Sequence, residues 1–121
     1  MKNGRAMNKN LRRCCVAGVI YFAGNPAIAQ ESARLALGEK VFDSSCKSCH
    51  DAGKAPSDAP QLSNQAQWKE RAGKGRAELY KSAIEGFTGY YAMPPRGGDA
   101  ARTDDEVKAA VDYMLQRAGV K

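Results

Sequence analysis

Residues 46–50 read Cys46-Lys47-Ser48-Cys49-His50, and this stretch decides how the rest of the chain is interpreted. Two thiols stand two residues apart, and an imidazole follows the second one directly. A thioredoxin-like redox pair has the same thiol spacing but occurs within a βαβ unit, and no such pattern surrounds these residues. A structural zinc ion takes four ligands, whereas the chain after residue 29 offers only two cysteines and one histidine.

The stretch instead matches C-x-x-C-H, the sequence to which c-type haem is attached. In this chemistry two thiols add to the vinyl groups on one edge of the porphyrin, and the adjacent imidazole binds the iron. We therefore expect one haem c, with its iron, bound covalently through Cys46 and Cys49. His50 is expected to be the proximal ligand of the iron.

A count of residues limits the second axial ligand to a methionine, a weaker ligand such as lysine, or water. His50 is the only histidine, so a second imidazole from the same chain is excluded. Met93 is followed by Pro94 and Pro95, which stiffen its loop, whereas Met114 lies on an apolar helix stripe, where methionine fills cores. We predict Met93 as the distal ligand. The alternative is a Met93 that covers the haem edge without binding iron.

The first 29 residues have the three parts of a secretory signal peptide. A positive start without acidic residues precedes an apolar run from Cys14 to Gly24 and the small-residue sequence Ala27-Ile28-Ala29. We predict cleavage after Ala29 and export of a single domain, residues 30–121, to the bacterial periplasm. The apolar run is shorter than the roughly 20 residues that span a bilayer. An uncleaved leader that tethers a haem subunit to a larger oxidoreductase remains the alternative.

Most of the positive charge belongs to this leader. The chain has a net charge of +6, but five of its 19 basic residues and none of its 13 acidic residues lie in residues 1–29. The remainder is close to neutral. The basic composition therefore gives no reason to expect a nucleic-acid partner.

Helical periodicity and end signals predict an all-α domain. Helices are expected from Ser32 to about Asp43, from Gln65 to Arg71, from Arg76 to Glu85, and from Thr103 to Gly119, with loops over residues 46–61 and 89–101. The last helix has the clearest start, because Thr103 and Glu106 form a capping box. A small domain with few large apolar side chains is expected to need a cofactor for stability.

The chain resembles the class I cytochromes c over nearly all of residues 30–121. Residues 91–98 (Tyr-Ala-Met-Pro-Pro-Arg-Gly-Gly) and 111–114 (Val-Asp-Tyr-Met) are similar to the bacterial cytochrome c-five type. The resemblance implies an all-α class I cytochrome c fold, with about four short helices wrapped round one covalent haem. It also implies a periplasmic one-electron carrier rather than an enzyme, with a redox donor and acceptor, in a respiratory chain.

We further expect a monomer with peripheral or no membrane contact. An open-site haem protein, gas-binding or peroxidase-like, is the alternative function, and it requires that Met93 does not bind the iron. The carbonyl of Pro60 would accept the second ring N–H of His50, with Pro56 as a rival for this role. Such contacts fix the orientation of a metal-binding imidazole.

The resemblance further implies that Gly38 and Phe42 pack across the last helix, with Tyr113 as their aromatic partner. Trp68 and Arg96 are either neighbours of the haem propionates or simply packing and surface residues. Many members of the group carry a further cysteine pair, which this chain lacks after residue 29.

Overall fold

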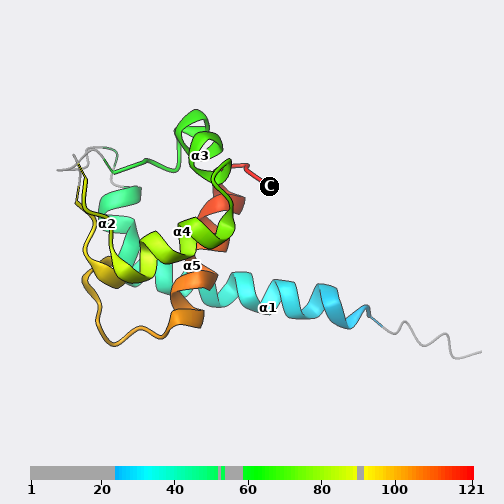
Figure 1. Cartoon of the computed structure of the whole chain (residues 1–121). Helices are drawn as coiled ribbons and strands as arrows, with labels where there is room; N and C mark the ends of the chain where they lie inside the picture. The colour runs from blue at the N-terminus through cyan, green and yellow to red at the C-terminus, as the bar shows by residue number, and fades with distance from the viewer. Residues whose placement is uncertain (1–23, 52, 54–58, 90–91) are drawn as a thin grey trace, which may run out of the picture.

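The computed structural model describes residues 24–51, 53, 59–89 and 92–121. The elements in chain order are α1 (Pro26–Val41), a π-helical turn η1 (Phe42–Cys46), α2 (Lys47–His50), α3 (Gln65–Ala72), α4 (Arg76–Glu85), a 3-10 turn η2 (Pro95–Gly98) and α5 (Asp104–Arg117). The predicted all-α class is confirmed, with four helices of eight or more residues in the described part (Figure 1). Within these ranges no helix is both long and apolar enough to cross a membrane.

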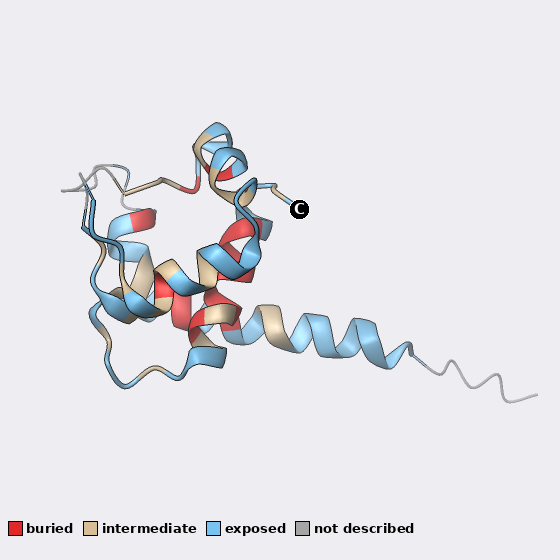
Figure 2. Cartoon of the chain, viewed as in Figure 1, coloured by how far each residue is buried: buried red, intermediate tan, exposed pale blue. Residues whose placement is uncertain are grey.

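Helix α1 begins six residues before the predicted start at Ser32. The side chain of Asn25 caps it by accepting a hydrogen bond from the amide of Ala27 at 3.2 Å, and Pro26 occupies the first turn, both favourable at a helix start. Residues 24–33 are exposed, and this part of α1 projects from the rest of the fold (Figures 1 and 2). The predicted cleavage point after Ala29 falls within this projection. The rest of the predicted leader, residues 1–23, lies outside the described residues.

The second half of α1 crosses α5 at very short range. A Cβ atom built on Gly38 would lie 2.1 Å from the carbonyl oxygen of Ala109 and 2.9 Å from the Cβ of Tyr113. One turn further on, the rings of Phe42 and Tyr113 pack with centroids 5.4 Å apart. The buried residues cluster around this crossing (Figure 2). The expected packing of Gly38 and Phe42 against the last helix is therefore confirmed.

Helix α5 forms the centre of the core and begins as predicted. The capping box is present: the Glu106 amide donates to Thr103 Oγ1 at 3.3 Å, and the Thr103 amide donates to Glu106 Oε2 at 2.9 Å. Nearly every residue from Val107 to Leu115 is buried. After the last turn, Gly119 adopts a φ of +68°, a conformation that glycine takes without strain at helix ends.

One buried carboxylate joins three helices. Asp112 of α5 is only 5% exposed, and it accepts hydrogen bonds from Arg34 of α1 at 2.7 Å, Arg76 of α4 at 2.8 Å and the hydroxyl of Tyr80 at 2.6 Å. A buried charge is tolerated only when it is paired and hydrogen-bonded. This network holds α1 and α4 against α5 around the apolar core.

Substituting Gly38 by alanine should separate α1 from α5. The added methyl group meets a backbone carbonyl that cannot rotate away, so we expect a loss of about 3 kcal/mol in the free energy of unfolding, measured with urea. Gly73→Ala is the control: Gly73 has a helical φ of −60°, and its nearest neighbour would lie at 3.2 Å. The control should change stability by less than about 1 kcal/mol. Equal losses in both variants would contradict the close crossing.

A protein that begins at Gln30 should be as stable as one that keeps residues 24–29. All residues of the deleted part of α1 are exposed, so their removal takes no side chain from the core. We expect the free energies of unfolding to agree within about 0.5 kcal/mol. A larger loss would show that the first turn of α1 contributes to the fold.

Candidate functional site

The segment that carries the two thiols continues directly from α1. Residues Phe42–Cys46 form a π-helical turn that leads into the single helical turn Lys47–His50 without a break. The predicted loop from residue 46 is therefore wrong for its first residues, because the wider turn extends the helix instead of ending it. Such π turns occur often at functional sites. Their sequence signature is too weak to have been recognised here.

The two thiols differ in environment. Cys46 is half-buried against the core and Cys49 is exposed, and neither forms a disulfide. Burial raises the pKa of the Cys46 thiol to about 11, so this thiol is protonated at neutral pH. Reactive redox cysteines have a lowered pKa and attack as thiolates. The environment of Cys46 is therefore unlike that of a thiol–disulfide exchange site.

The imidazole of His50 is buried and held in one orientation. Its Nδ1 lies 3.0 Å from the carbonyl oxygen of Pro60. Because a carbonyl only accepts, Nδ1 carries the proton and Nε2 carries a lone pair. Burial lowers the pKa of His50 and so favours the neutral ring, whereas the hydrogen bond to Pro60 acts in the opposite direction. Nε2 has no hydrogen-bond partner within the described residues. The rival Pro56 lies outside them.

The chain after the motif folds back and closes over this histidine. The Leu62 amide donates to the carbonyl of His50 at 2.9 Å, and the side chain of Gln61 donates to the carbonyl of Cys49 at 2.7 Å. The indole Nε1 of Trp68 in turn donates to the carbonyl of Gln61 at 2.9 Å. No sequence pattern distinguishes Gln61, because a glutamine in a polar loop carries no such signal.

The same contacts describe the surroundings of Trp68, for which a haem-propionate neighbour and a packing residue were the two expected roles. Its ring is buried, with its centroid 6.0 Å from that of His50, and its single N–H is already used by Gln61. An indole has no other donor, so Trp68 packs in the core with no N–H left to donate to a haem propionate. Arg96 is also engaged by the protein, through Asp104 at 2.6 Å and the carbonyl of Arg102 at 2.8 Å.

Met93 lies on a segment that is fixed at its backbone. Met93 and Phe87 exchange two backbone hydrogen bonds of 2.9 Å each, the one isolated β-bridge of the described residues. Gly86 permits this approach: its φ is +86°, and a Cβ there would lie 2.9 Å from the carbonyl oxygen of Met93. The half-buried Met93 side chain packs against the same core as Cys46. Met114 is only 5% exposed within that core, as predicted.

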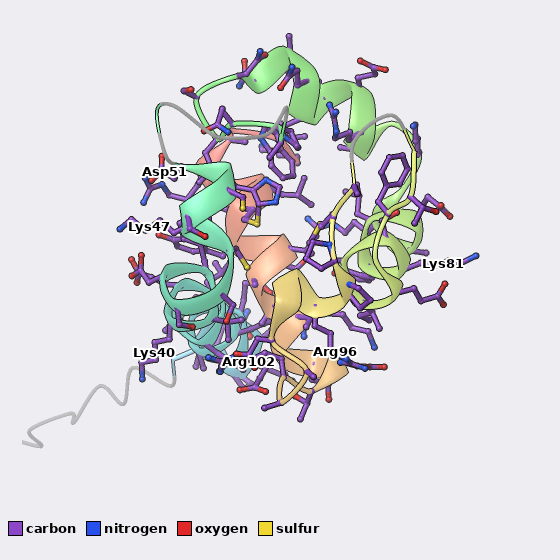
Figure 3. The ribbon with its side chains drawn as sticks, turned by 90° about the vertical axis from the view of Figure 1, so that its left-hand side faces the viewer. Lys40, Lys47, Asp51, Lys81, Arg96 and Arg102 are labelled. Carbon is purple, nitrogen blue, oxygen red and sulfur yellow. The ribbon has the colours of Figure 1, made fainter. Side chains whose placement is uncertain are left out.

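The residues present fit a c-type haem. Two unbonded thiols with the right spacing precede a buried imidazole whose Nε2 is available, and a thioether packs against the same core. These are the donors of a Met/His-ligated c-type haem. Figure 3 views this side of the molecule, with Lys47 and Asp51 of the motif turn on one side and Lys81 of α4 on the other.

Comparisons with known proteins agree with this donor set. A family model described as "Cytochrome C oxidase, cbb3-type, subunit III" matches residues 33–114. The chain is 33% identical to cytochrome c-555 of Chlorobaculum tepidum over 110 residues, which cover 90% of this chain and 96% of the relative. It is 36% identical to cytochrome c5 of Azotobacter vinelandii over 77 residues, covering 64% and 89%.

A solved structure is also similar. Its title describes an electron transfer complex of nitrite reductase with cytochrome c, and the matching chain has a TM-score of 0.58 and 34% sequence identity. The match covers 68% of this chain and 94% of that one. The relatives are electron-carrier cytochromes and not enzymes.

Replacing Trp68 by phenylalanine should loosen the segment over His50. The carbonyl of Gln61 loses its donor while most of the ring stays buried, so we expect a loss of about 1–3 kcal/mol in urea unfolding. Gln65→Ala is the control, because it removes an exposed hydrogen bond of 3.1 Å to the carbonyl of Gly119. A Trp68→Phe cost no larger than that of the control would refute the role of this contact.

Proposed function

The chain belongs to the monohaem class I c-type cytochromes and is related to cytochrome c-555 and cytochrome c5, and on that premise we propose that it is a periplasmic carrier of single electrons in a respiratory chain. Haem, when bound, supplies an iron that gains and loses one electron. The thiols of Cys46 and Cys49 would attach the haem, and His50 and Met93 would hold its iron. With the redox chemistry supplied by the haem and the ligands supplied by the chain, the protein would exchange electrons with larger redox proteins.

The contact between His50 and Pro60 is the observation that carries the proposal. It fixes the neutral tautomer, directs Nε2 away from the Pro60 carbonyl, and strengthens Nε2 as a ligand. Because His50 is only 7% exposed, protein and not water would surround the iron on the side of this ligand. A rigid, shielded ligand that needs no rearrangement suits electron transfer.

Met93 as the distal ligand distinguishes a carrier from an open-site haem protein. Thioether ligation raises the reduction potential, and a filled sixth position excludes gas or peroxide. The Phe87 bridge, the two prolines and the partly buried side chain all support a methionine that is held in place. Within the described residues no other methionine outside the helical core is available.

The partners would be a redox donor and a redox acceptor, each meeting the carrier transiently as a monomer. The relative solved in complex with nitrite reductase gives an example of an electron-transfer partner for a similar chain. Export to the periplasm rests on the signal-peptide pattern of residues 1–29. The mass of the mature protein tests cleavage, because a chain starting at Gln30 differs from one that keeps its leader.

Met93→Ala should keep the covalent haem but open the iron. We expect loss of the weak far-red band of sulfur-ligated ferric haem, a lower reduction potential, and binding of carbon monoxide by the reduced protein. These are measured by visible spectroscopy and redox titration. An unchanged far-red band in this variant would reject Met93 as the ligand and favour the open-site alternative.

Met114→Ala is the matched control. Met114 is buried in α5, so its truncation should cost about 2–5 kcal/mol in unfolding free energy. Its far-red band and potential should stay those of the parent protein. Loss of the band in Met114→Ala, with retention in Met93→Ala, would reverse the assignment of the two methionines.

A further inference from the structure

We propose that Arg102 is a positioning residue for Met93: it fastens residues 92–99 to the turn that leads into the haem-attachment motif. The inference rests on the proposed function, in which Met93 is the distal ligand. Arg102 lies nine residues from Met93 along the chain and does not bind the haem in this account. Its role is to limit how often the Met93 segment moves away from the iron.

The side chain of Arg102 joins three parts of the fold. It donates from Nη2 to Ser44 Oγ at 2.9 Å, from Nε to Ser45 Oγ at 3.3 Å and to Asp99 Oδ2 at 2.9 Å, and from Nη1 to Glu106 Oε1 at 3.1 Å. Ser44 and Ser45 belong to the π turn, Asp99 is the last residue of the segment 92–99, and Glu106 is in the first turn of α5. The side chain is 26% exposed, so these contacts are partly shielded from water.

Backbone contacts bring the same two segments together. Gly97 has a φ of +66°, and a Cβ there would lie 2.9 Å from the carbonyl oxygen of Ser45, the residue before Cys46. Ser45 Oγ also donates to Asp99 Oδ2 at 3.2 Å. Arg96 completes the cluster by donating to the carbonyl of Arg102 at 2.8 Å, and both arginines lie at the same end of the molecule (Figure 3).

The Met93 segment is thus held at both ends. The backbone pair with Phe87 fixes it on the α4 side, and the Arg102 cluster fixes it on the side of Cys46. An added ligand reaches the iron only in the fraction of molecules in which Met93 has moved away. The apparent affinity of that ligand therefore measures the fraction that is open.

The geometry requires the guanidinium and not only its charge. An arginine presents several N–H donors in a fixed fork, whereas a lysine has one compact ammonium group. Arg102→Gln removes the charge and the fork together, and Arg102→Lys removes the fork alone. Arg34→Gln is a matched control, because Arg34 pairs with Asp112 and forms no hydrogen bond or ion pair with residues 92–99.

The test is a titration of the oxidised holoprotein with imidazole, followed through the far-red band. Loss of charged hydrogen bonds should raise imidazole affinity about tenfold in both Arg102→Gln and Arg102→Lys. Arg34→Gln should stay within about twofold of the imidazole affinity of the parent protein, although we expect urea unfolding to show that it is destabilised by loss of the contact with Asp112. This contrast separates positioning of the ligand from general stability.

Three results would overturn the inference. An imidazole affinity unchanged in Arg102→Gln would mean that the cluster does not hold Met93. An imidazole affinity in Arg102→Lys equal to that of the parent protein would mean that the charge alone acts. An equal rise in Arg34→Gln means that the effect is global. A parent protein that has covalent haem but no far-red band would instead reject Met93 ligation, and with it the proposed function.

A milder variant serves if the Arg102 variants do not accumulate as holoprotein. Asp99→Asn keeps the shape of a partly exposed side chain and weakens one charged contact of the cluster. It should raise imidazole affinity severalfold in the same titration. An unchanged affinity in Asp99→Asn would also contradict the inference.

Discussion

The close approach of α1 and α5 at Gly38 is the contact on which the rest of the fold depends. With no side chain at Gly38, the two backbones meet, and Phe42 one turn later packs on Tyr113. This crossing fixes the direction of the chain as it enters the π turn. The position of Cys46 and of the motif that follows is therefore set by an interhelical contact with α5, and Asp112 reinforces the arrangement through Arg34 and Arg76.

The two proposed iron ligands are each held by contacts from elsewhere in the chain. His50 is oriented by Pro60, and the segment that contains Pro60 is held in turn by Trp68. Met93 is paired with Phe87, and its segment is fastened beyond Gly97 by Arg102. Because the protein itself holds His50 and Met93 in place, little rearrangement should accompany oxidation or reduction. This is the physical requirement of an electron carrier.

Much of this arrangement could be predicted from the sequence, and the reasons differ by residue. The attachment motif and the capping box of Thr103 are local patterns, and the Gly38 and Pro60 contacts followed from the resemblance to class I cytochromes c. The early start of α1 at Pro26 was missed because exposed residues there carry no apolar periodicity. The π turn was missed because its local signature is weak. The Asp112 network and the link from Arg102 to Ser44 and Ser45 join residues distant in sequence, whose meeting no local pattern encodes.

The visible absorption spectrum of the intact protein, produced with haem-maturation machinery and recorded oxidised and reduced, tests the central claim most directly. The account predicts sharp c-type bands in the reduced protein and the weak far-red band of sulfur-ligated iron in the oxidised one. Covalent haem without the far-red band would contradict the closed Met93 site, and a protein without covalent haem would contradict the account as a whole.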